Sequence, residues 1–112
     1  MKTPLVLSAD DGIYVFQSEH DLIRDIEAID VANGEYVVYD GEGRLLSLSV
    51  ERSKGILGAL RGSKVVLGET SEFRNEELRG FLIAHLERLG GQPKELGSLT
   101  LDQLLGRVEP ES

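Results

Sequence analysis

The chain has 112 residues, a formal net charge of −8 and no cysteine. A chain of this length forms one domain, residues 1–112, and buries roughly 65% of the surface that its unfolded form exposes. The lack of cysteine excludes disulfides, thiolate zinc sites and thiol nucleophiles, and it suits a reducing compartment. The N-terminal apolar run is too short for a signal peptide, and no run reaches the roughly 20 residues of a membrane helix. We therefore expect a single cytoplasmic domain outside the membrane.

The acidic excess is concentrated at the start of the chain. Residues 1–43 contain ten acids and two bases, whereas residues 44–112 contain ten of each. Nucleic acids and anionic membranes are polyanions, so we expect neither as a partner of this surface. One interpretation is a charge that only keeps a small domain soluble. The other is a surface that matches a basic protein partner.

Two β-hairpins are predicted. The first joins apolar runs at 5–7 and 13–16 through a turn at 8–12. The second covers residues 34–50 and reverses at 40–43, where two glycines can adopt positive φ. Its first arm is apolar on both faces, which indicates a central strand. Its second arm alternates leucine or valine with serine, which indicates one buried face and one exposed face.

Three helices are predicted from capping residues and apolar periodicity. The first covers Glu19–Ile29 and carries acidic residues on its exposed face. The second is capped by Ser71 or Asn75, carries an apolar stripe and ends at Gly90. The third is a short helix over residues 101–105 that begins with a capping box.

With a further strand at 64–68, these elements predict an α+β domain. We expect an antiparallel sheet of about four to five strands, with the two main helices packed on it and the short C-terminal helix at an edge or end. The stretch 52–64 is basic and rich in glycine, but it fits neither a P-loop nor a dinucleotide fingerprint. Within it, residues 53–63 are predicted to be the most mobile internal segment. Residues 109–112 are predicted to fray.

No pattern selects a catalytic or metal site, so we expect neither an enzyme nor a cofactor. His85 lies in the apolar stripe of the second helix, where a neutral structural imidazole is the expected role. His20, with Asp21 and Asp25, lacks the converging ligands of a metal site. The sequence singles out no pair of carboxylates for acid–base chemistry and no base for a serine nucleophile.

Two segments carry a resemblance to known proteins. DGIYVF at 11–16 and IDVANGEYVVYDGEGRLL at 29–46 resemble a pattern in small, mostly uncharacterised bacterial proteins. In size, acidity and lack of cysteine the chain also resembles immunity proteins of polymorphic or contact-dependent toxin systems. The resemblance implies a non-enzymatic cytoplasmic inhibitor of a toxin domain, often a nuclease or deaminase with a basic active site. It assigns no role to an individual residue.

We therefore predict an immunity-type protein that binds a basic toxin domain through its acidic half, with electrostatically steered association. The alternatives are a small ligand-binding or adaptor domain that uses the stretch 52–64, and a small hydrolase. The oligomeric state stays open. The predicted partner-binding residues are the acids Asp10, Asp11, Asp21, Asp25, Glu35, Asp40 and Glu42.

Overall fold

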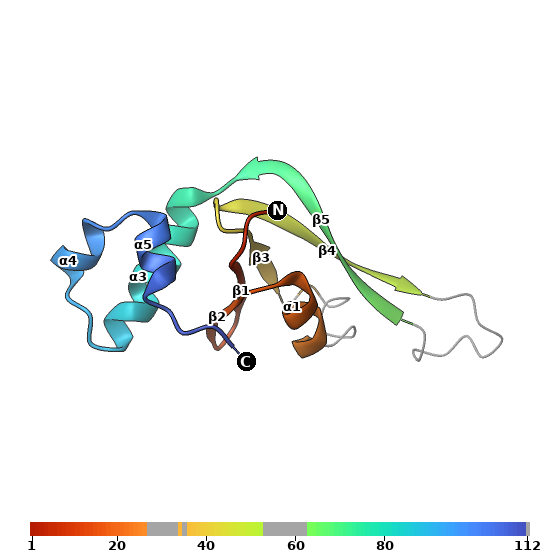
Figure 1. Cartoon of the computed structure of the whole chain (residues 1–112), viewed down its shortest axis with the longest axis horizontal. Coiled ribbons are helices and arrows are strands. Elements are labelled where there is room, and N and C mark those ends of the chain that lie inside the picture. The colour runs from red at the N-terminus through yellow and green to blue at the C-terminus, as the bar shows by residue number, and fades with distance from the viewer. Residues whose placement is uncertain (27–33, 35, 53–62, 112) are drawn as a thin grey trace.

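The computed structural model describes residues 1–26, 34, 36–52 and 63–111. These residues form one five-stranded antiparallel sheet in the order β2-β1-β3-β4-β5, together with helices (Figure 1). The predicted α+β class is confirmed. The strands are β1 (Leu5–Ala9), β2 (Gly12–Phe16), β3 (Val37–Tyr39), β4 (Arg44–Arg52) and β5 (Ser63–Phe73). The helices are α1 (Glu19–Asp25), α3 (Asn75–Arg88), α4 (Pro93–Gly97) and α5 (Leu101–Gly106).

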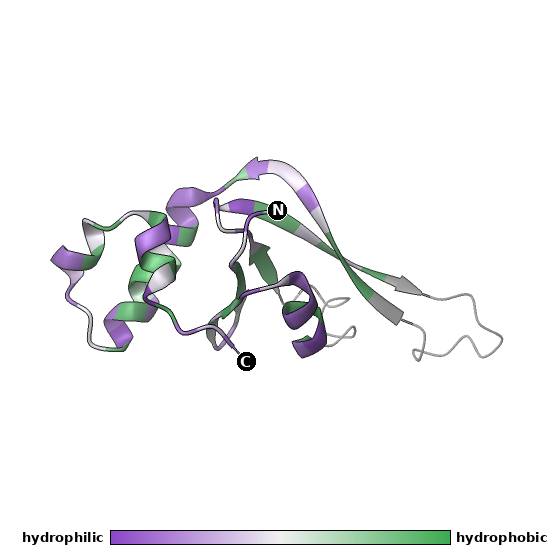
Figure 2. Ribbon diagram, in the orientation of Figure 1, coloured by the Kyte–Doolittle hydropathy of each residue, from purple (hydrophilic) through white to green (hydrophobic). Residues whose placement is uncertain are grey.

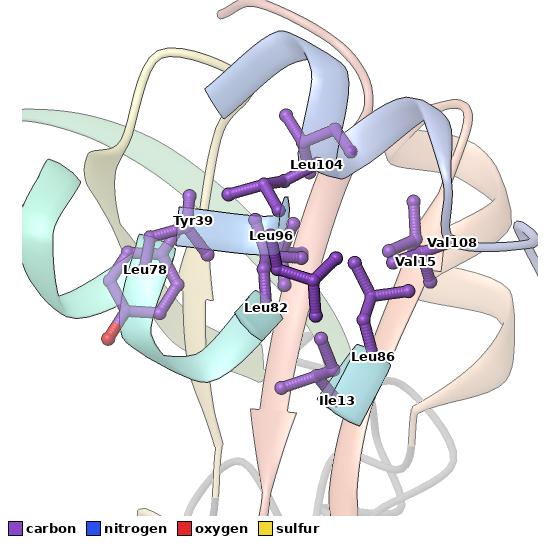
Figure 3. Close-up of a cluster of buried hydrophobic side chains, with 11 residues drawn as sticks. Ile13, Val15, Tyr39, Leu78, Leu82, Leu86, Leu96, Leu104 and Val108 are labelled. Carbon is purple, nitrogen blue, oxygen red and sulfur yellow. The ribbon is translucent and has the colours of Figure 1, made fainter. Parts of the chain in front are cut away.

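Alternating side chains divide the apolar residues of the sheet between two cores. On β1, Val6 faces the first core, while Leu5 and Leu7 face the second. On β3, Tyr39 faces the first core and Val38 faces the second. The first core (Figure 3) is completed by Ile13, Val15, Leu78, Leu82, Leu86, Leu96, Leu104, Leu105 and Val108. The second is completed by Phe16, Leu22, Ile26, Leu46, Val65 and Leu67.

The helices therefore cover both faces of the sheet. The first core is enclosed by α3, α4 and α5, and the second is covered by α1. In Figure 2 the hydrophobic residues of β1 and β3 lie between these two layers of helices. α1 begins as predicted, because the Ser18 Oγ accepts a hydrogen bond from the Asp21 N–H at 3.1 Å. It ends earlier than predicted, because Ile26 is extended. The remainder of the predicted helix, residues 27–29, lies outside the described residues.

The predicted hairpin at 34–50 is confirmed as β3 and β4, and β3 is a central strand between β1 and β4. Leu46 is buried while Ser47 and Ser49 are exposed, as the alternation predicts. Gly43 has φ +82°, a conformation that the turn requires and that glycine adopts without strain.

The start of α3 differs from the prediction. Neither predicted cap is used, because Ser71 belongs to β5 and Asn75 is already helical. The Asn75 side chain instead donates a hydrogen bond to the Glu42 carbonyl at 2.8 Å and ties α3 to the β3–β4 turn. The apolar spacing of this helix also predicts that Phe81 and Leu89 are buried, but both are exposed.

The C-terminal region contains more order than the sequence indicated. The capping box is confirmed, because Thr100 Oγ1 accepts from Gln103 N–H and Gln103 Oε1 accepts from Thr100 N–H. α4, which begins with a proline at its first turn, was not predicted. The prediction that the tail frays is wrong for Glu111, whose backbone N–H donates to the Val15 carbonyl at 2.7 Å.

Tyr39 connects the first core to the surface of α3. Its ring is buried, and its O–H donates a hydrogen bond to a carboxylate oxygen of Glu77 (Figure 3 shows the ring at the border of the core). Burial raises the pKa of Tyr39 far above its ordinary value of about 10, and the Glu77 carboxylate adds to this shift. Both effects favour the neutral phenol.

Tyr39 should make the fold sensitive to alkali. Below about pH 10 the phenol is protonated in the folded and unfolded states alike, so its stabilising effect is fully present. Above that pH the unfolded state ionises first, and the free energy of unfolding should fall as pH rises towards the folded-state pKa. Urea unfolding at pH 8 and pH 11 checks this, with Tyr39→Phe as the comparison. An equal alkaline loss in wild type and Tyr39→Phe would contradict the assignment.

Candidate functional site: an acidic edge beside strand β2

The acids of the two predicted hairpins lie at opposite ends of the sheet. β1 pairs with β2 through Ala9 and Gly12 at one end, and with β3 through Val6 and Tyr39 near the other. A strand of five residues spans about 17 Å. The acids of the second hairpin therefore lie apart from Asp10 and Asp11, so the predicted acids do not form one continuous surface.

One group of carboxylates does converge, around the phenol of Tyr14. The Tyr14 O–H donates to Asp11 Oδ2 at 2.6 Å. That hydrogen bond is the main cause of a raised Tyr14 pKa, followed by burial and by the negative charges of Asp11, Glu111 and Asp25. With the exposed neighbour Asp10, these three acids form the acidic edge: Asp10, Asp11, Asp25 and Glu111.

Three different elements build the acidic edge. Asp10 and Asp11 lie in the β1–β2 turn, and Asp25 is the last residue of α1. Glu111 is brought to β2 by the C-terminal tail, whose Val108 is buried in the first core. Figure 1 shows the C-terminus, β2 and α1 on one side of the molecule.

Sequence reasoning missed Glu111. The local signal was an apolar Val108 shortly after the end of the last helix, since an apolar side chain there can anchor the tail to the core. The backbone hydrogen bond from Glu111 to Val15 joins residues that are far apart in the sequence. No local pattern predicts such a contact.

Asp21 belongs to α1 but contributes less free charge than its neighbours. One of its carboxylate oxygens lies 3.3 Å from Arg24 Nη2, so the two charges form an exposed ion pair. Asp25 has no such pair within the part of the chain that the structure describes. Of the two predicted helix acids, Asp25 is the one available to a cation.

Asp40 is buried and holds its own turn, so it lacks the exposure that its predicted role in partner binding requires. Its side chain is 2% exposed. Oδ1 accepts hydrogen bonds from the backbone N–H groups of Glu42 at 2.9 Å and Arg44 at 3.0 Å. Oδ2 lies 3.8 Å from Arg44 Nε. An aspartate that accepts from its own turn in this way fixes the turn and faces inwards.

The remaining predicted acids do not join the acidic edge. Glu42 is exposed in the β3–β4 turn, at the other end of the sheet from Asp10 and Asp11. Glu35 lies outside the described residues. Residues 53–62, which make up most of the stretch 52–64, lie outside them as well, so the predicted mobility of this segment stays a prediction. Three of the seven predicted acids, Asp10, Asp11 and Asp25, thus lie together.

One hollow adjoins the acidic edge at Asp11, and a second lies beside the tail that carries Glu111. A recess of about 220 Å³ is lined by Asp11, Tyr14, His85 and Arg88. His85 is half-buried at this recess and not in the core, and its imidazole forms no hydrogen bond or ion pair with a described residue. The second hollow is a cleft of about 520 Å³ between Thr3, Pro4, Val15, Gln17, Asp102, Leu105, Gly106, Val108 and Pro110.

The described residues contain no group of three or more histidines, aspartates or glutamates that could hold a metal ion. None of the helices in this part of the chain is both long enough and apolar enough to cross a membrane. No family model, curated protein or solved structure gives a significant match to the chain.

Proposed function

We propose that the protein is a non-enzymatic immunity-type inhibitor that binds a basic toxin domain through the acidic edge. The observation that carries this proposal is the acidic edge itself. Asp11 accepts a hydrogen bond from Tyr14, the tail holds Glu111 against the neighbouring Val15, and the charges of Glu111 and Asp25 act on Tyr14. The chain brings these carboxylates together from three elements, within a molecule whose net charge is −8. A basic surface is the complement of such an arrangement.

Electrostatics supports rapid capture of a basic partner. Like charges that are held close together raise the local negative potential, and this potential steers a cation towards the edge over about one Debye length, ~8 Å at physiological salt. Nucleases and other enzymes that act on polyanions need basic active sites. An acidic protein bound over such a site excludes the substrate by charge and by bulk.

The surroundings of the acidic edge supply shape as well as charge. The cleft of about 520 Å³ shares Val15 with the tail contact that positions Glu111. Its wall includes Asp102, which forms an exposed ion pair with Lys2 at 3.2 Å. A projecting side chain of the partner would find apolar contacts in the cleft, while the Asp102 carboxylate at its wall is already paired with Lys2.

Genetic context and co-expression test the function. Immunity genes lie directly downstream of the toxin genes that they counteract, so the gene upstream of this one should encode a domain that arrests growth when expressed alone. Co-expression with this protein should restore growth, whereas co-expression with an unrelated acidic protein of similar size should not. Growth arrest that this protein fails to relieve, or an upstream product without toxicity, would refute the proposal.

A further inference from the structure

The recess of about 220 Å³ lies between the end of α3 and the start of β2. One of its walls carries an acid from the β1–β2 turn, Asp11, and the other carries two basic side chains of α3, His85 and Arg88. Leu86 of α3 and Ile13 of β2 both belong to the first core (Figure 3), which holds the helix against the strand. The recess is therefore built between two packed elements and contains both signs of charge.

The opposite charges of the recess do not pair with each other. Asp11 Oδ2 accepts the hydrogen bond from Tyr14, and the second oxygen of Asp11 has no partner among the residues that the structure describes. Arg88 Nε donates a long hydrogen bond, 3.4 Å, to the Ala84 carbonyl of its own helix. Within the described ranges, neither His85 nor Arg88 forms an ion pair. Donors and an acceptor thus face one recess with capacity left for a ligand.

A ligand that carries both charges complements this recess. We propose that the recess binds a free α-amino acid with a small apolar side chain. Its carboxylate contacts Arg88 and His85, and its ammonium group contacts Asp11. A guanidinium donates paired hydrogen bonds to a carboxylate, and an imidazole has at least one N–H to donate in either protonation state. A zwitterion has no net charge, so the net charge of −8 on the chain does not repel it.

The size and the apolar lining of the recess limit the ligand. A volume of about 220 Å³ corresponds to roughly seven water molecules at ~30 Å³ each, which suits a short amino acid such as valine. Leu89 lines the recess and is 71% exposed, so an apolar ligand side chain would remove part of it from water. The recess shares Asp11 with the acidic edge but needs no toxin, so this proposal does not depend on the proposed function.

NMR titration of the isotope-labelled protein with three related ligands tests the proposal without mutation. L-valine should shift the backbone amide signals of residues 11–14 and 85–89 saturably, with a dissociation constant of about 1 mM. N-acetyl-L-valine lacks the ammonium group and L-valinamide lacks the carboxylate. Each should bind at least about tenfold more weakly, because it loses a charge-assisted hydrogen bond. Signals that about 20 mM L-valine leaves in place, or equal affinities of the three ligands, would overturn the proposal.

Two variants assign the ligand groups to their partners. Arg88→Gln should raise the dissociation constant of L-valine at least about tenfold but leave the weak binding of L-valinamide unchanged, because that ligand has no carboxylate to lose. Asp11→Asn keeps an oxygen acceptor for Tyr14 and should weaken L-valine by a similar factor, but not N-acetyl-L-valine. An unchanged affinity for L-valine in either variant would overturn the proposed contacts.

Lys94→Gln is the matched control for Arg88→Gln. It removes the same charge from an exposed residue of α4 that does not line the recess. Its dissociation constant for L-valine should stay close to that of wild type. Thermal unfolding of each variant checks that it is folded before its affinity is interpreted. An equal loss of affinity in Lys94→Gln and Arg88→Gln would show that only the net charge matters and would overturn the site.

Discussion

Asp40→Ala should lower the free energy of unfolding by about 2 kcal/mol, because it leaves two partly buried backbone donors without their acceptor. Those donors are the N–H groups of Glu42 and Arg44, at 2.9 and 3.0 Å from Oδ1. The substitution also leaves the guanidinium of Arg44 without its nearby carboxylate. Urea unfolding at pH 7 measures the change.

Glu42→Ala is the matched control for Asp40→Ala. Glu42 lies two residues away in the same turn and is exposed, so its loss should change the free energy of unfolding by no more than about 0.5 kcal/mol. Asp40→Asn keeps one acceptor for the backbone and should fall between the two. Equal stability of Asp40→Ala and Glu42→Ala would show that the carboxylate does not hold the turn.

Reversing the free charges of the acidic edge should slow association with the toxin domain by about a hundredfold at low salt. The variant is the triple substitution of Asp10, Asp25 and Glu111 by Lys. It leaves Asp11 in place, so the hydrogen bond from Tyr14 survives. It also keeps the backbone N–H of Glu111 that contacts Val15. Stability should change little, because exposed charges contribute little to folding.

A second triple variant separates local charge from total charge. Lysine at Glu42, Glu76 and Glu95 makes the same change in net charge on exposed residues of the β3–β4 turn, α3 and α4. Stopped-flow mixing with the toxin domain should show a much smaller loss of association rate for this control. Raising the salt should slow wild-type association and reduce the difference between the variants. Equal rate losses in the two triple variants would show that only the net charge matters.

The fold could be read from the sequence where local chemistry decides the structure. The start of α1 follows from Ser18, and the capping box at Thr100 predicts the start of α5. The end of α1 could not be predicted from the sequence, because the apolar spacing continues past Asp25 while the backbone leaves the helix at Ile26. The cap of α3 was also misread, because Asn75 contacts the distant residue Glu42 instead of its own helix.

Only part of the candidate site could be predicted from the sequence, because its geometry depends on long-range contacts. The acids of the β1–β2 turn and of α1 could be listed from the sequence. Their convergence with Glu111 depends on the tail and on the path of α1 over the sheet. In the sequence, Asp40 cannot be distinguished from any other acidic residue in a turn. In the structure it is buried, and its carboxylate accepts hydrogen bonds from its own turn. Charge counts along a sequence do not distinguish these two roles.

Titration of the purified upstream toxin domain with this protein tests the central claim most directly. A stoichiometric inhibitor should reduce toxin activity in proportion to the amount added and abolish it at one binding site per toxin molecule. The inhibition should be independent of incubation time once binding is complete, and toxin released from the complex should regain full activity. Time-dependent loss of toxin activity at a small fraction of one equivalent would identify an enzyme and contradict the account. Full toxin activity in the presence of excess protein would contradict it equally.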